Sequence, residues 1–216
     1  MARVIETKGD LFRAPPGAAL IHACNCQGNW GKGIAKEFKE RYPRAFQIYR
    51  SHCQKYLSGP QSKLITRTQI ANESGSEKSG LNRLLRLPEG TALIIPPQER
   101  DQQHHSSGLG SRRSRRRPPR TGPRAAHTQP RDHWIICLFT SWHYGAARRS
   151  PSDVILENTV LAVEDLKNQI SAGKAESDLQ LWTCKINAGL FGVPWESTKA
   201  VLEQSGLGFR VVSPDQ

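Results

Sequence analysis

The chain has 216 residues, of which 37% are hydrophobic, and a formal net charge of +12 at pH 7. This length supports one well-packed core, so we expect a single domain over residues 1–216. No apolar run approaches the ~20 residues that a membrane-spanning helix needs, and residues 1–12 lack the apolar stretch of a secretory signal. These features predict an intracellular protein, cytoplasmic or nuclear, with no membrane partner.

The positive charge is concentrated in one segment. Residues 102–131 contain eight arginines and no acidic residue, and without these eight charges the chain would carry only +4. Pro, Gly, Ser and Arg dominate the segment. It therefore has too little apolar surface to offset the entropy lost on ordering, and we predict a disordered Arg-rich insert.

A structureless segment of this length between two core strands is unusual. Because the composition changes abruptly at both ends, we hypothesise that residues 102–131 are a mis-spliced or mis-predicted segment, which sequencing of the transcript would test. The alternative is an RNA-binding arginine arm. Its lack of aromatic residues disfavours a nucleic-acid partner.

Strand-like and helix-like stretches alternate along the rest of the chain. A short apolar run at 18–23 ends in a Gly-rich loop, and Gly33–Tyr56 has helical periodicity with a break or kink at Pro43. Thr91–Ile95 and His133–Thr140 are β-rich runs without alternation, which is typical of strands covered on both faces.

The same alternation continues to the end of the chain. We predict a helix from Ser152 to Ile170, a strand within Leu179–Ile186, a helix from Pro194 to Gln204 and a strand at Phe209–Val212. This order predicts a sheet between two helical layers. A polar stretch, Gln69–Gly80, is expected to form a surface loop.

The first candidate binding loop is Asn25–Ala35, directly after a strand and directly before a helix. Gly28, Gly31 and Gly33 permit positive φ and close approach of backbone N–H groups to a ligand. The helix N-terminus that follows suits a phosphate or diphosphate. The spacing matches neither a Walker loop nor a dinucleotide fingerprint.

The second candidate loop, Asn187–Pro194, follows the same plan. A strand leads into a loop with two glycines, and a helix begins after the proline. Two such loops at the carboxyl ends of strands converge on one crevice.

Together these loops resemble the ligand loops of macrodomains. The sequence Ile21-His-Ala-Cys-Asn-Cys26, followed by Gly28-x-Trp30-Gly31-x-Gly33-Ile-Ala35, is similar to the first loop of the yeast-type branch, known for ADP-ribose 1''-phosphate phosphatase activity. Asn187-Ala-Gly-Leu-Phe-Gly-Val-Pro-Trp195 resembles its second loop, and Gly9-Asp-Leu-Phe12 its N-terminal element. The resemblance implies a three-layer α/β/α macrodomain with a mixed central sheet.

The resemblance also implies residue roles. Asp10 would accept a hydrogen bond from the adenine amino group, Asn25 would contact the distal ribose, and Phe191 would flank that ribose. The alternatives are that Asp10 caps a turn and that Phe191 belongs to the core. The expected substrate-contacting residues are Gly9, Asp10, Leu11, Cys24, Asn25, Cys26, Gly31, Lys32, Gly33, Ile34, Ala35, Lys36, Asn187, Ala188, Gly189, Leu190, Phe191, Gly192 and Val193.

Asn25 and His22 are the catalytic candidates. His22 stands where the wider family has an asparagine, and a neutral imidazole so close to Asn25 could relay a proton. Its position on a buried strand also fits a core histidine. His143 and Tyr144, after the strand that ends at Thr140, either touch the ligand or are exposed loop residues.

No metal or cofactor is expected. The five cysteines are odd in number and scattered, and Cys24-Asn-Cys26 is spaced too closely for a usual zinc pair. Catalysis would then depend on positioning and on backbone N–H groups, with water as the nucleophile.

The resemblance thus implies a monomer that binds a small-molecule ADP-ribose derivative and removes the 1''-phosphate from ADP-ribose 1''-phosphate. Two alternatives share the same cradle. One is a non-catalytic reader of ADP-ribose, and the other is a hydrolase that removes ADP-ribose from modified proteins.

Overall fold

Six strands form one mixed sheet in the order β1-β8-β7-β2-β6-β5. In the computed structural model, residues 3–66, 82–98 and 132–215 are described. Neighbouring strands are parallel except β5, which runs antiparallel to β6. The bounds are β1 (Val4–Lys8), β2 (Ala19–Asn25), β5 (Ala92–Ile95), β6 (Trp134–Ser141), β7 (Leu181–Thr183) and β8 (Phe209–Ser213).

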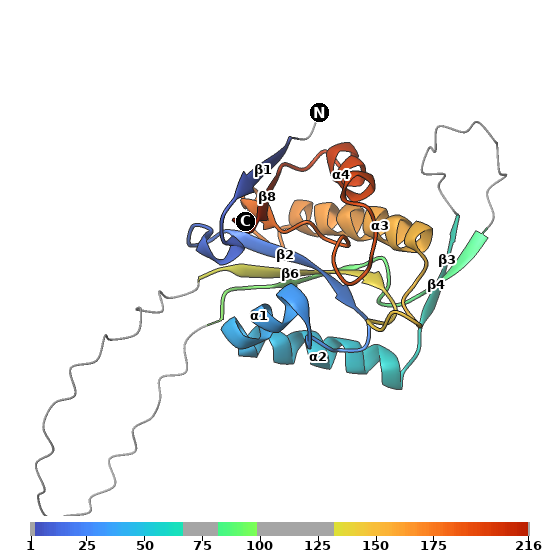
Figure 1. Cartoon of the computed structure of the whole chain (residues 1–216). Coiled ribbons are helices and arrows are strands. Elements are labelled where there is room, and N and C mark those ends of the chain that lie inside the picture. Colours follow the sequence, from blue (N-terminus) through green and yellow to red (C-terminus); the bar gives the residue numbers. More distant parts are fainter. Residues whose placement is uncertain (1–2, 67–81, 99–131, 216) are drawn as a thin grey trace, which may run out of the picture.

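Helices cover both faces of this sheet (Figure 1). A core on one face joins the sheet to the 3-10 helix η1 (Leu11–Arg13), α1 (Gly33–Arg41) and α2 (Pro43–Ser58). A second core on the other face joins it to α3 (Ser152–Ser171) and α4 (Trp195–Gln204). The predicted three-layer α/β/α arrangement with a mixed sheet is therefore confirmed.

The central strands are the ones whose sequences are almost entirely apolar. Every residue of β2 and β6 is buried except Ala23 and Trp134, which are half-buried. The predicted break at Pro43 is also confirmed, since α1 ends at Arg41 and Pro43 is the first residue of α2. No helix within the described ranges is long and apolar enough to cross a bilayer.

The structure differs from the sequence prediction at three strand regions. The strand predicted within Leu179–Ile186 is only three residues long, because the chain leaves the sheet at Cys184 to build the second loop. The edge strand β1 and the hairpin of β3 (Ser62–Thr66) and β4 (Asn82–Arg86) were not predicted. The polar stretch Gln69–Gly80 and the Arg-rich insert lie outside the described residues.

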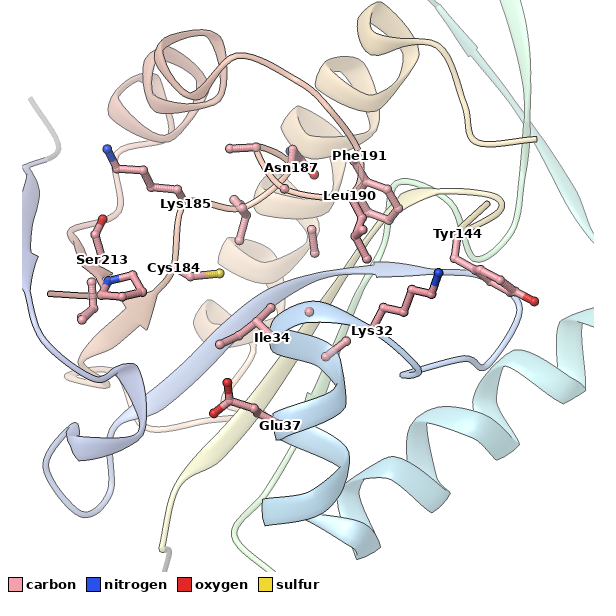
Figure 2. Close-up of a pocket in the computed structure, with 18 of the residues that line it drawn as sticks. Lys32, Ile34, Glu37, Tyr144, Cys184, Lys185, Asn187, Leu190, Phe191 and Ser213 are labelled. Atoms are coloured by element: carbon pink, nitrogen blue, oxygen red, sulfur yellow. The ribbon is translucent and has the colours of Figure 1, made fainter. Parts of the chain in front are cut away.

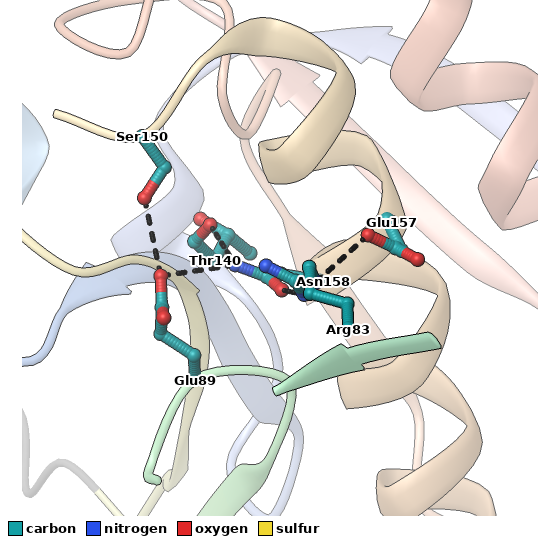
Figure 3. A network of polar contacts seen from close by, with 6 residues as sticks. All are labelled: Arg83, Glu89, Thr140, Ser150, Glu157 and Asn158. Atoms are coloured by element: carbon teal, nitrogen blue, oxygen red, sulfur yellow. Dashed lines mark hydrogen bonds and ion pairs between the residues drawn. The ribbon is translucent and has the colours of Figure 1, made fainter. Parts of the chain in front are cut away.

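A buried polar network connects the hairpin to the strand ends (Figure 3). Arg83 of β4 pairs with Glu157 at 3.1 Å and donates a hydrogen bond to Asn158, both on α3. Asn158 in turn donates to the Thr140 carbonyl at 3.0 Å and to Oε1 of Glu89 at 3.2 Å. The network thereby fixes the end of β6 against α3.

Two further bonds extend this network to both loops that follow the strands. Ser150 donates its hydroxyl to Glu89 at 3.1 Å. The Thr140 hydroxyl donates to Oδ1 of Asn187 at 2.9 Å, and Asn187 donates through Nδ2 to Thr159 at 2.9 Å. The start of the second predicted ligand loop is thus held by buried side chains of β6 and α3.

We predict that Asn158→Ala lowers the free energy of unfolding by about 1–3 kcal/mol, because it leaves buried acceptors without their donor. Urea denaturation measures the change. Asn168→Ala, an exposed site on the same helix, gains the same helix propensity and should stay within about 0.5 kcal/mol. Equal effects at the two sites would contradict this role for Asn158.

The burial of Glu89 makes the free energy of unfolding depend on pH. Burial raises the pKa of this carboxyl above its ordinary value of 4.5, although hydrogen bonds from Ser150 and Asn158 and the charge of Arg83 oppose the shift. A raised pKa means that the folded state binds more protons, so stability contributed by this group is lost as pH rises through the folded pKa. Glu89→Gln keeps an oxygen acceptor and should remove that slope from unfolding curves measured upward from pH 4.5; an unchanged slope would contradict the assignment.

Candidate functional site

A cavity of about 1440 Å³ opens at the carboxyl edge of the parallel strands. Residues at or just after the ends of β1, β2, β6, β7 and β8 line it, together with the N-terminus of α1 (Figure 2). This is the edge where open α/β sheets bind ligands. The predicted residues that line it are Asn25, Gly31, Lys32, Gly33, Ile34, Ala35, Asn187, Ala188, Gly189, Leu190 and Phe191.

Asn25 shapes the first loop with its own side chain. Oδ1 accepts the Gln27 N–H at 2.9 Å, and Nδ2 donates to the Asn29 carbonyl at 2.6 Å. An amide nitrogen carries two hydrogens, so the second remains for a ligand in the cavity. The predicted contact of Asn25 with the ligand is therefore compatible with its structural role.

Trp30 anchors the same loop from beneath. Its ring is 1% exposed and stacks on Tyr49 of α2 with centroids 4.7 Å apart. The Tyr49 hydroxyl donates to the Asn25 carbonyl at 2.7 Å. The helix below thus holds both the middle and the start of the loop.

Two glycines let the loop turn into α1. Gly33 has φ +57°, a left-handed conformation that non-glycine residues seldom adopt, at the first position of the helix. Gly28 also has a positive φ, +71°, whereas Gly31 does not use the freedom that its missing side chain permits.

His22 does not reach the cavity. Its ring is fully buried, stacks on Phe38 at 4.1 Å and meets the edge of Trp30 at 4.7 Å. A catalytic base needs hydrogen-bond reach of the substrate, which this position does not offer. The structure places His22 in the core, the alternative that its buried strand suggested.

Cys24 and Cys26 are also core residues. They are 1% and 0% exposed and lie outside the cavity lining, and burial raises the pKa of both thiols. Cys24, His22 and Cys137 bring potential ligand atoms within 4.8 Å of one another. However, Sγ of Cys24 lies 3.6 Å from Nδ1 and 3.5 Å from Nε2 of His22, so it sits over the ring face and away from the in-plane lone pairs.

The second loop closes over the first. Asn187 takes φ +63°, which asparagine tolerates better than most residues. Leu190 is 54% exposed, and its Cδ1 lies 3.8 Å from the point that a Cβ on Gly33 would occupy. Phe191 lines the cavity and also packs against Ile155, so both interpretations of Phe191 hold in part.

The N-terminal element lies beside the other end of the cavity. Asp10 accepts the Phe12 N–H at 2.9 Å and so caps η1, as its alternative interpretation proposed. Gly9 donates its N–H to the Ser213 carbonyl at 2.9 Å, and Ser213 lines the cavity. Asp10 is exposed, and neither it nor Gly9 nor the buried Leu11 is part of the lining.

Three other predicted residues lie outside the cavity. Lys36 is exposed and pairs with Glu40 at 3.7 Å. Val193 is buried in the core, and Gly192 is exposed.

Comparison with known proteins decides the family. The chain is 50% identical over 219 residues to "ADP-ribose 1''-phosphate phosphatase" of Neosartorya fischeri, covering 99% of this chain and 95% of the relative. It is 48% identical over 262 aligned positions to the protein of that name in Ajellomyces capsulatus, covering 99% and 98%. The chain belongs to this family.

Solved structures agree on the fold. The macrodomain of Mycobacterium tuberculosis DarG superposes with a TM-score of 0.56 at 17% identity, covering all of both chains. That of Thermus aquaticus DarG also gives 0.56, at 20% identity, covering 99% of this chain and 100% of the other. No protein-family model matches the chain. The fold is that of a macrodomain.

Several residues that build this macrodomain cavity carry no motif that sequence reasoning could use. Arg149, from the loop after β6, donates through Nη1 to the Leu190 carbonyl at 2.8 Å and so links that loop to the second ligand loop. Tyr49 supports Asn25 from the middle of an amphipathic helix. Tyr144 lines the cavity, as expected if this residue touches the ligand. The neighbouring His143 is only 9% exposed and does not line it.

We predict that Gly192→Ala disturbs the second loop of this macrodomain. At φ +66° the new Cβ would lie 2.8 Å from Nη1 of Arg149, so the arginine would lose its place beside Leu190. We expect a loss of about 1–3 kcal/mol in unfolding free energy and weaker ADP-ribose binding by calorimetry.

Gly173→Ala is the matched control. Gly173 has φ +76° with no atom within 4 Å of its would-be Cβ, so it carries the backbone strain without the arginine contact. Its variant should bind ADP-ribose like the wild type. Normal binding by Gly192→Ala as well would show that the Arg149 contact does not matter.

Proposed function

We propose that the chain is an ADP-ribose 1''-phosphate phosphatase, which hydrolyses the 1''-phosphomonoester to ADP-ribose and phosphate. The observation that carries this proposal is the near full-length similarity to relatives of that name, at about 48–50% identity. The two motif-bearing loops lie on opposite sides of one cavity in this chain, which supports the same assignment.

The cavity supplies positioning and polar stabilisation. The backbone N–H groups at the start of α1 are not used within the helix, and the helix dipole favours an anion there. Together with the loop at Asn187–Val193 they would hold the diphosphate, while Asp10 would bind adenine and Asn25 the distal ribose. A bound substrate would thus have its terminal ester fixed for attack.

In the reaction, a water oxygen forms a bond to phosphorus, and the bond from phosphorus to the ribose O1'' breaks. The proton from water passes to the departing oxygen, which becomes the hydroxyl of ADP-ribose. Preorganised N–H donors near the phosphoryl oxygens would stabilise the charge that develops there.

We further propose that the protein acts as a monomer inside the cell. All five cysteines are free thiols, as in a reducing compartment.

Phosphate release from ADP-ribose 1''-phosphate tests the function directly. We expect turnover by the wild type that persists in EDTA, and a loss of about 100-fold or more in Asn25→Ala, the scale on which positioning defects act. Asn25→Asp keeps the acceptor for Gln27 but loses the donor to the Asn29 carbonyl, so urea denaturation of both variants is measured beside turnover to separate loop loosening from a lost ligand contact.

Calorimetry with ADP-ribose distinguishes the alternatives. Binding without phosphate release would indicate a reader. Release of ADP-ribose from modified protein, with none of phosphate, would indicate the protein-directed hydrolase. Loss of turnover in EDTA would contradict the metal-independent mechanism.

A further inference from the structure

We propose that Lys32 forms the subsite for the terminal phosphate and makes the cavity prefer ligands with a 1''-phosphomonoester over ADP-ribose itself. The inference rests on the proposed function for the identity of its ligand. Its own content is a specificity subsite built on one cationic side chain at the start of α1.

The sheet order tells which end of the cavity holds which part of the ligand. Asp10, the predicted adenine partner, follows β1, and Asn25, the predicted ribose partner, ends β2, three strands away in the order β1-β8-β7-β2. Tyr144 follows β6, the next strand beyond β2. Four strand spacings of about 4.8 Å give a span of roughly 19 Å, which suits an extended dinucleotide-like ligand. The group beyond the distal ribose therefore faces Tyr144.

Lys32 reaches toward this end. It precedes α1 at the N-cap position, where an ammonium group cannot cap the helix because it has no acceptor. Figure 2 shows the side chain extending from the start of α1 toward the backbone end of Tyr144, whose hydroxyl points away from Lys32. Both residues line the cavity, and Tyr144 is 43% exposed.

The charge of Lys32 is not neutralised by its surroundings. Within residues 3–66, 82–98 and 132–215, no carboxylate lies within 4 Å of its ammonium group. Lys185, toward the β1 end, differs because it pairs with Glu6 at 3.4 Å. The lining acid Glu37 is likewise paired, with Arg41 at 3.3 Å. The cavity thus presents an unpaired cation at the end that faces the terminal group.

A phosphomonoester fits this cation chemically. Near neutral pH it carries up to two negative charges and three acceptor oxygens, to which a lysine ammonium can donate charge-assisted hydrogen bonds. ADP-ribose ends there in a neutral hydroxyl, which gains little from a cation. Lys32 therefore adds affinity only for the phosphorylated ligand.

The test compares both ligands in Lys32→Gln and Tyr144→Phe. For Lys32→Gln we expect the KM for ADP-ribose 1''-phosphate to rise about tenfold, the effect of one charge-assisted contact. The calorimetric Kd for ADP-ribose should change less than twofold. Tyr144→Phe removes a hydroxyl that points away from Lys32 and should leave both values unchanged.

Two further variants isolate the charge in the cavity. Lys32→Arg should restore most of the lost affinity because it keeps a cation at the same position. Lys39→Gln removes the same charge from the exposed side of α1, outside the cavity lining, and should leave the KM unchanged.

Two results would overturn the proposal. Equal weakening of both ligands by Lys32→Gln would place Lys32 on the diphosphate, and no change in either would remove it from the site. If the wild type releases no phosphate, the proposed function fails, yet calorimetry with both ligands still decides the subsite. Lys32-dependent preference for the phosphorylated ligand would support the subsite in that case too.

Discussion

The hydrogen bond from the Tyr49 hydroxyl to the Asn25 carbonyl is the interaction on which the first loop depends. It forms where β2 ends and the backbone must leave the sheet, so it holds that carbonyl at 2.7 Å in an environment that excludes water. Trp30 stacks on the same tyrosine ring and fixes the loop five residues later. Since α1 begins directly after this loop, the direction of its dipole toward the cavity follows from the same contact.

The two loops are held in different ways. One buried hydrogen bond from Tyr49 and the stacking of Trp30 on its ring anchor the first loop, whereas a series of buried hydrogen bonds from Arg83 through Asn158 and Thr140 to Asn187 anchors the second. Networks of this kind rigidify a structure when every member is satisfied and are costly when one is lost. Substitution of any one member should therefore loosen the second loop.

The parts of the fold that could be predicted are those with a strong local signal. The apolar runs of β2 and β6, the break at Pro43 and the two loops after strands were all visible in the sequence. The edge strand β1 was not, because only its first and fourth residues are partly buried and the rest are exposed. The hairpin β3–β4 was not predicted for a similar reason. Leu64 and Leu84 pair across its two strands, and both side chains are mostly exposed.

The site residues that could be predicted are likewise those with a strong local signal. Residues within the glycine-rich loops were predicted because these loops resemble a family pattern, and most of them line the cavity. Cys24 and His22 were included by proximity in sequence, yet alternation along β2 turns their side chains into the core. Arg149 and Tyr49 contact residues that are far away in the sequence, so no local sequence pattern could predict their roles.

The antiparallel pairing of β5 with β6 has a consequence for how this lineage can vary. Ile95 pairs with Ile135, so the chain leaves and re-enters the sheet at neighbouring points. Because β6 runs parallel to β2, those points lie at the amino edge of the sheet, opposite the cavity. Selection for ligand binding acts on the far edge, which leaves this junction free to gain or lose sequence during evolution. The same separation makes it the natural place for a reporter or affinity tag that must not disturb the pocket.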